Sequence, residues 1–280
     1  MRIFPISDLH VNFYTEHGDH SFYSVEKMKK MFRPLGTGDD TVLLACGDIG
    51  DGMCGLFWCM QMLTAFPNLQ ICYTPGNHEF YGSNMNTLIR QYFDIEYKCA
   101  HPRLHILDGV NTFRTIIRDN INRPILAIIG GTLWTNYMDG NSGIMNECAH
   151  GMNDYKCITI GNENHLLRPT NCLNLHGEMS KRIFKTIDSI DKAIPVVCMS
   201  HHVPYAEVAT DALHWAYHSD LSEKFNALER VPKYWFHGHT HQSSLYTGTF
   251  TNGQCTFISN QYGYPTELTT GYNNKCIVEV

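Results

Sequence analysis

Asp, Asn and His residues stand directly after five short apolar segments of the chain. The segments have the length and the Val, Ile, Leu and aromatic content of buried strands. In α/β proteins the chemistry gathers at the carboxyl ends of such strands, because those ends meet at one edge of a sheet. The polar residues after these segments are therefore the candidates for a functional site. They are Asp8, His10, Asp48, Asn77, His78, His201, His202, His239 and His241.

These side chains are suited to binding transition metals. Imidazole nitrogens combined with carboxylate and carboxamide oxygens suit Mn, Fe or Zn ions, whereas sites built of oxygen alone suit Mg or Ca. Each motif taken alone has an ordinary structural explanation, such as a polar turn for Asp8-x-His10. Together they offer more ligands than one ion needs. Two ions that share a carboxylate would keep open positions for water and substrate, an arrangement that suits in-line phosphoryl transfer.

The elements that must position these residues alternate along the chain. Short apolar segments bounded by turn residues predict strands, and apolar residues three or four positions apart predict helices. Ser219 is expected to cap the last of these helices. The alternation predicts an α/β protein with much parallel sheet. The predicted strands are 3–7, 41–46, 69–74, 125–130, 194–200, 234–237, 255–259 and 276–280, and the predicted helices are 54–65, 86–97, 178–193 and 221–228.

Residues 132–175 carry little periodicity and many Asn and Gly residues, so we expect a long functional loop or insertion there. Predicted strands resume beyond this stretch. The chain shows no internal repeat, low-complexity tract or Pro/Ser linker. The sequence therefore predicts a single domain over residues 1–280.

The composition is that of a globular protein, with 43% hydrophobic and 17% charged residues among 280. A net charge of −6 and the absence of a Lys/Arg run disfavour long nucleic acid as a partner. No apolar stretch reaches the roughly 18 residues of a membrane span, so no membrane association is expected. The eleven cysteines form no Cys-x-x-Cys pair, and the first residues do not resemble a secretory signal. These features predict reduced thiols in a cytoplasmic protein.

In their order and spacing the motifs resemble those of the calcineurin-like metallophosphoesterases. The resemblance spans residues 8–241 and implies an α/β fold, a four-layer sandwich of two mixed β-sheets flanked by helices, with a dinuclear metal site at one edge. It implies a phosphoester hydrolase in which a hydroxide bridging two metal ions attacks the phosphorus. The motifs that carry it are Asp8-x-His10, Gly47-Asp48, Gly76-Asn77-His78-Glu79, His201 and Gly238-His239-x-His241.

The resemblance also implies a role for each motif residue. Asp48 would bridge two divalent ions, and His78 would be the catalytic residue that assists the leaving oxygen. Manganese is the expected metal, with iron, zinc, nickel and magnesium as alternatives. The remaining ligands would divide into Asp8, His10 and His241 for one ion and Asn77, His201 and His239 for the other.

Two adjacent histidines compete for the fifth motif. His201 directly follows a predicted strand and stands three residues before Pro204, a Ser-His-x-x-Pro arrangement that some family members show. We therefore assign the metal-ligand role to His201. Adjacent side chains leaving a strand face opposite sides, so His202 is expected to contact the substrate or to support a neighbouring residue.

The sequence leaves the substrate open. A small phosphomonoester, phosphodiester or nucleotide fits the ligand set, and a nuclease or a catalytically silent binding scaffold is an alternative. The stretches 131–135, 152–155 and 216–221 resemble a bacterial subgroup of the family without indicating what its members act on. No Gly-x-Ser-x-Gly elbow or phosphate-binding glycine loop supports another class of enzyme. Nothing in the sequence indicates an oligomeric state.

Overall fold

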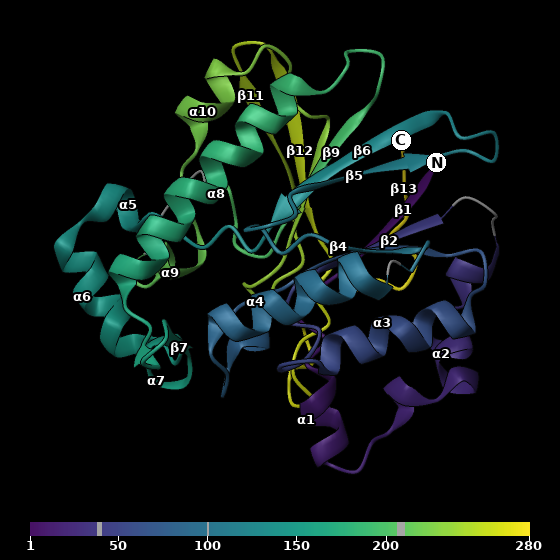
Figure 1. The fold of residues 1–280 in the computed structure, drawn as a ribbon, viewed down its shortest axis with the longest axis horizontal. Helices are drawn as coiled ribbons and strands as arrows, with labels where there is room; N and C mark the ends of the chain where they lie inside the picture. Colours follow the sequence, from purple (N-terminus) through teal and green to yellow (C-terminus); the bar gives the residue numbers. More distant parts are fainter. Residues whose placement is uncertain (38–40, 100, 206–210) are drawn as a thin grey trace.

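The computed structural model describes residues 1–37, 41–99, 101–205 and 211–280. Within these ranges two β-sheets pack together, with helices on the outer side of each (Figure 1). Both sheets are mixed, because parallel strands in the middle pair with antiparallel strands at an edge. The first sheet has the order β13 (Val278–Glu279), β1 (Arg2–Ile6), β2 (Thr41–Cys46), β3 (Gln70–Thr74) and β4 (Leu104–Ile106). The second has the order β11 (Leu245–Phe250), β12 (Gly253–Ser259), β10 (Tyr234–His237), β9 (Val196–Ser200), β6 (Pro124–Gly131) and β5 (Arg114–Arg118).

Helices cover the two sheets from opposite sides (Figure 1). The first sheet packs against α1 (Val11–Glu16), α2 (Val25–Met31), α3 (Cys54–Ala65) and α4 (Met85–Asp94). The second packs against α8 (Pro169–Ser189) and α10 (Ser222–Ala227). At one end of the sandwich lie α5 (Tyr137–Gly140), α6 (Ser142–Gly151), α7 (Asp154–Cys157), α9 (His214–Tyr217) and the small hairpin of β7 (Thr159–Ile160) and β8 (His165–Leu166). Single turns are η1 (Ser21–Tyr23), η2 (Arg33–Thr37), η3 (His78–Phe80) and the π-helical η4 (Ile95–Cys99).

The layers follow from the alternation of side chains along each strand. In β2, Leu43 packs with the helices of the first sheet, whereas Leu44 lies between the two sheets. In β9, Val197 lies between the sheets and Cys198 packs with α8 and α10. Both faces of these strands are buried, which explains why they read as continuous apolar runs. The predicted α/β sandwich of two mixed sheets flanked by helices is confirmed.

The strands that position polar residues at their ends were predicted well, whereas of the four edge strands of the two large sheets only β13 lies within a predicted strand. The predicted strands 41–46 and 234–237 coincide with β2 and β10. Strands β4, β5 and β11 were missed. β5 and β11 lie at edges of the second sheet and both contain exposed positions, so they present no continuous apolar run.

The expectation of a long loop or insertion over 132–175 is corrected in one respect, because the stretch is not a loop. This stretch contains α5, α6, α7 and the β7–β8 hairpin, and α8 begins within it at Pro169 rather than at residue 178. The start of α8 is fixed by its proline and by the Asn171 side chain, which accepts a hydrogen bond from the Arg168 backbone N–H. Its buried face includes Cys172 and His176, and a buried histidine hides the helical period from a search for apolar residues.

Ser219 does not cap α10 as predicted. The helix begins at Ser222, and the Ser219 hydroxyl instead accepts a hydrogen bond from the Asn136 backbone N–H. Asp220 accepts a hydrogen bond from the Ser222 N–H just before the first turn.

Among the helices of the described ranges, none combines the length and the apolar character that crossing a bilayer requires.

Candidate metal centre

The carboxyl ends of the central strands of both sheets meet at one edge of the sandwich. Asp8, Asp48 and Asn77 follow β1, β2 and β3 of the first sheet, and His201 and His239 follow β9 and β10 of the second. Hydrogen bonds join the two sets of loops. The His239 N–H donates to the Asp8 carboxylate at 3.0 Å, and His201 Nδ1 lies 3.0 Å from the Cys46 carbonyl at the end of β2. All seven predicted ligands therefore gather at one place.

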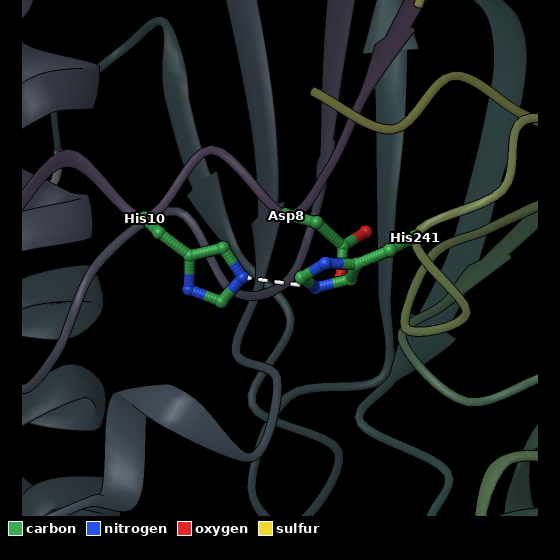
Figure 2. A group of neighbouring side chains, drawn as sticks. All are labelled: Asp8, His10 and His241. Atoms are coloured by element: carbon green, nitrogen blue, oxygen red, sulfur yellow. Dashed lines mark hydrogen bonds and ion pairs between the residues drawn. The ribbon is translucent and has the colours of Figure 1, made fainter. Parts of the chain in front are cut away.

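The first group of ligands contains Asp8, His10 and His241 (Figure 2). The Nε2 atoms of His10 and His241 face each other at 3.1 Å, and His241 Nε2 lies 3.5 Å from Asp8 Oδ1. Asp8 and His10 are fully buried, whereas 17% of the His241 side chain is exposed. This group therefore reaches the molecular surface on one side.

The second group contains Asp48, His201 and His239, with Asn77 beside them. His201 Nε2 lies 2.9 Å from Asn77 Oδ1, 3.0 Å from His239 Nδ1 and 3.3 Å from Asp48 Oδ2. Asp48 also belongs to a third set with His10 and His78, all with ligand atoms within 4.8 Å of one another. Asp48 therefore lies between the two groups, where a bridging ligand is required.

The donor atoms of both groups fit divalent cations. Burial holds the pKa values of His10 and His239 well below the ordinary value, so both imidazoles are neutral and can offer a lone pair. His201 donates its Nδ1–H to the Cys46 carbonyl at 3.0 Å, which leaves the Nε2 lone pair directed at the group. Nitrogen lone pairs that converge on buried carboxylates call for a positive charge between them.

The buried carboxylates of Asp48 and Asp8 also favour a cation at this place. Burial alone would raise the pKa of Asp48, but the imidazoles of His201 and His78 outweigh burial and hold this pKa well below its ordinary value. Burial would likewise lower the pKa of His201, yet the carboxylates of Asp48 and Asp8 raise it to about 9. The carboxylates therefore favour a positive charge near His201 Nε2, the atom that Asn77 Oδ1, His239 Nδ1 and Asp48 Oδ2 surround. The residues present therefore fit two metal ions.

The backbone at the ligands is held in an unusual conformation. Positive φ angles occur at Asp8, His10, Asp48, His239 and His241, although none of them is glycine. Such left-handed residues cost free energy and cluster where a structure imposes a function. A Cβ atom at Gly76 would lie 2.1 Å from Asp48 Oδ1, so glycine there is required for the close approach of the carboxylate.

His78 lies beside both groups and lines a cavity of about 350 Å³. Its Nε2 lies 3.0 Å from the Tyr264 hydroxyl, its Nδ1 lies 3.6 Å from Asp51, and its ring stacks on Tyr81. Burial acts to lower the pKa of His78, but the carboxylates of Asp48 and Asp51 raise it. The arrangement therefore favours an imidazole that can give up a proton inside the cavity.

His202 is placed behind the second group. It is 1% exposed, its Nδ1 lies 3.1 Å from the Thr132 carbonyl, and its ring lies against Trp134 and His239 with centroids 5.1 and 4.3 Å away. It is absent from the described residues that line the cavity. Contact between His202 and a substrate stays a prediction, while packing against His239 agrees with the predicted supporting role.

Three carboxylates that the sequence did not assign to the site hold the ligands in place. Glu79 accepts hydrogen bonds from the backbone N–H groups of Asp48, Ile49 and Gly76 at 2.7–2.9 Å, and so fixes the loop after β2. Its position directly after Asn77-His78 was visible in the sequence, but its function was not. Such supporting residues determine ligand orientation as much as the ligands do.

The other two carboxylates come from distant segments. Asp154 of α7 accepts hydrogen bonds at 2.8 Å from Asn77 Nδ2 and from the Tyr81 hydroxyl, which leaves Asn77 Oδ1 facing His201. Glu267 lies 2.6 Å from His241 Nδ1 and leaves His241 Nε2 facing His10. Asp154 falls in the stretch 152–155 that resembles a bacterial subgroup, whereas no sequence signal marks Glu267.

A comparison with known proteins agrees with this geometry. The model of a protein family described as calcineurin-like phosphoesterase matches residues 1–243. The chain belongs to this family. The family inferred from the motifs is therefore confirmed, and with it the coarse expectation of a metal-binding phosphoesterase fold.

One sequence relative and one solved structure are similar to this calcineurin-like phosphoesterase. Over 218 residues the chain is 27% identical to "Uncharacterized protein L509" of Acanthamoeba polyphaga mimivirus, and the match covers 71% of this chain and 69% of the relative. The fold of this chain is similar to that of phosphopantetheinyl hydrolase (PptH) from Mycobacterium tuberculosis in its crystal structure. That structure has a TM-score of 0.57 and 14% identity, with 94% of this chain and 89% of the other covered, and so shows the fold alone.

Proposed function

We propose that the protein is a metal-dependent hydrolase that cleaves phosphoester bonds with two divalent ions. The observation that carries the proposal is the position of Asp48, whose carboxylate belongs both to the set with His201 and His239 and to the set with His10 and His78. A carboxylate shared in this way is what a pair of ions needs. Membership of the calcineurin-like phosphoesterase family supports the same reaction class.

The chain's own residues would divide the work. When bound, the two ions supply an activated water and neutralise charge on the phosphoryl oxygens. His78 would give the proton on Nε2 to the ester oxygen as the P–O bond breaks, and Asp51 beside Nδ1 would stabilise the protonated ring. The Tyr264 hydroxyl now occupies the place opposite Nε2, so the leaving oxygen of a bound substrate would replace it as the partner of His78.

The substrate is proposed to be a small phosphoester. The cavity of about 350 Å³ is at the lower end of the range for small-molecule sites. The acidic balance of the chain argues against long nucleic acid. The name of the structural neighbour, a phosphopantetheinyl hydrolase, is consistent with a hydrolase on a small ester, but at 14% identity it indicates no particular one.

Manganese is proposed as the activating metal, because both groups combine imidazole and carboxylate ligands and the second adds the carboxamide oxygen of Asn77. A reducing cytoplasmic location is proposed from the cysteines. Those whose side chains the structure describes are free thiols, and several, such as Cys46, Cys72 and Cys198, are buried in strands.

The proposed function is tested by assaying metal-free protein before and after reloading with Mn²⁺, using 4-nitrophenyl phosphate and bis(4-nitrophenyl) phosphate. We expect release of nitrophenol from at least one ester only after reloading. A protein that binds two ions and cleaves neither ester would instead be a scaffold. Asp94→Asn, an exposed substitution on α4, is the control that should behave like the wild type.

A further inference from the structure

The cavity beside the metal centre holds no strong cation of its own. Among the described residues that line it, none is Lys or Arg. Residues 38–40, 100 and 206–210, which lie outside the described ranges, include no Lys or Arg in the sequence either. Sites that bind a phosphate dianion commonly place Arg or Lys against its oxygens. Positive charge must therefore come from the ions and from imidazoles.

Carboxylates around the cavity would neutralise positive charge of the two divalent ions. Asp8 and Asp48 are buried ligands, Asp51 faces His78 at 3.6 Å, and Glu267 faces His241 at 2.6 Å. These carboxylates offset much of the positive charge of two divalent ions, and the buried carboxylates of Asp154 and Glu79 behind the ligands add further negative charge.

We infer that this centre selects small phosphodiesters, which carry one negative charge, over phosphomonoesters and polyanions; the inference rests on the proposed function. A phosphomonoester carries about 1.5 to 2 negative charges near neutral pH, whereas a diester carries one. The additional charge of a monoester would stand in a partly water-excluded cavity without a partner, where an unpaired charge is costly.

The surroundings also offer room for the second organic group of a diester. Tyr81, Tyr217 and Tyr264 line the cavity with aromatic rings. Glu267 in addition lines a neighbouring cavity of about 730 Å³, whose wall includes Tyr14, Tyr262 and Tyr272. Uncharged groups on both sides of the phosphate would contact these rings.

The first experiment compares two esters with the same leaving group, methyl 4-nitrophenyl phosphate and 4-nitrophenyl phosphate, on the manganese-loaded protein. We expect kcat/KM for the diester to exceed that for the monoester by at least about 10-fold. Equal or faster cleavage of the monoester overturns the inference and leaves the proposed function standing. Cleavage of neither contradicts the proposed function itself. A single-stranded DNA arm should show no cleavage, and efficient cutting of DNA would also overturn the selection against polyanions.

The second experiment places a positively charged side chain in the cavity. Asn153 lines the cavity and is exposed, so Asn153→Arg can be accommodated, with Asn153→Gln as the matched neutral control. Relative to this control, arginine should lower the ratio of diester to monoester kcat/KM about 5-fold. Calorimetric binding of inorganic phosphate to the manganese-loaded variants should tighten about 5-fold as well. Unchanged phosphate affinity and an unchanged ratio would mean that the cavity does not lack positive charge.

Discussion

The two ligand groups of the metal centre differ in how deeply they lie. His201, His239 and Asn77 are 0–5% exposed, and their support comes from the buried carboxylate of Asp154. In the other group the side chain of His241 is 17% exposed, and its supporting Glu267 is 36% exposed. Both groups border the cavity, one through Asn77 and His239 and the other through His241, and only His241 among these three is more than slightly exposed to solvent.

This difference indicates that the two ligand groups, here called the two halves of the centre, hold their ions with different strength. Buried ligands are fixed by packing and hydrogen bonds, so the Asn77–His201–His239 group should retain its ion more firmly. The group of Asp8, His10 and His241 includes the partly exposed His241 and should exchange its ion more readily. Asp48 and His78 lie where the halves meet, so changes there should affect both.

The largest effect is expected for Asp48→Asn, because this residue contributes to both halves. An amide cannot bridge two cations as a carboxylate does, and its N–H groups would point at one of them. We expect metal content to fall in both groups and kcat/KM to fall by at least about 10²–10³-fold. Elemental analysis and steady-state kinetics measure this, with Asp94→Asn as control. Retention of two ions with near-full activity would show that the halves do not share Asp48.

His78→Ala should leave both halves loaded and remove the proton donor. We expect two ions per chain, as in the wild type, and a loss of turnover of about 10²–10⁴-fold. The loss should be greater for alkyl esters than for nitrophenyl esters, because a poor leaving group depends more on protonation. An equal loss for both ester types would speak against proton donation by His78.

The variants His201→Ala and His202→Ala should distinguish a metal ligand of the buried group from a residue that packs behind it. His201 Nε2 lies within 3.3 Å of three donor atoms of the group, so its removal should cost one of the two ions. His202 packs behind His239, so His202→Ala should keep both ions and alter kcat or KM. Metal contents of the two variants measured side by side decide the matter. Loss of an ion in His202→Ala alone would transfer the ligand role to His202.

Substitution of the supporting carboxylates should give the smallest effects and distinguish the halves. Asp154→Asn should weaken the buried half and Glu267→Gln the exposed half, each by about 10–100-fold in metal affinity. Glu163→Gln is a matched control, since Glu163 also pairs with a histidine, His165 at 2.9 Å, but lies outside the centre. Melting temperatures of the metal-free proteins separate lost support from lost folding. If Glu267→Gln and Glu163→Gln bind Mn²⁺ equally well, Glu267 does not orient His241.

The convergence of the candidate ligands could be predicted because each lies within a few residues of a strand end. Asp8, Asp48 and Asn77 follow parallel neighbours, whose carboxyl ends must share an edge. The supporting residues follow no such rule. Asp154 reaches Asn77 through a segment without a predicted element, and Glu267 and Tyr264 come from the chain after β12, beyond the range that matches the family model. Their places depend on loop paths that strand and helix periods do not encode.

The most direct test of the shared centre is a titration of metal-free protein with Mn²⁺ that follows bound metal and ester hydrolysis together. We predict two tightly bound equivalents, hydrolysis that develops fully only with the second, and earlier loss of one ion than of the other when a chelator is added. Saturation at a single ion with full hydrolysis, or hydrolysis without bound metal, would contradict this prediction.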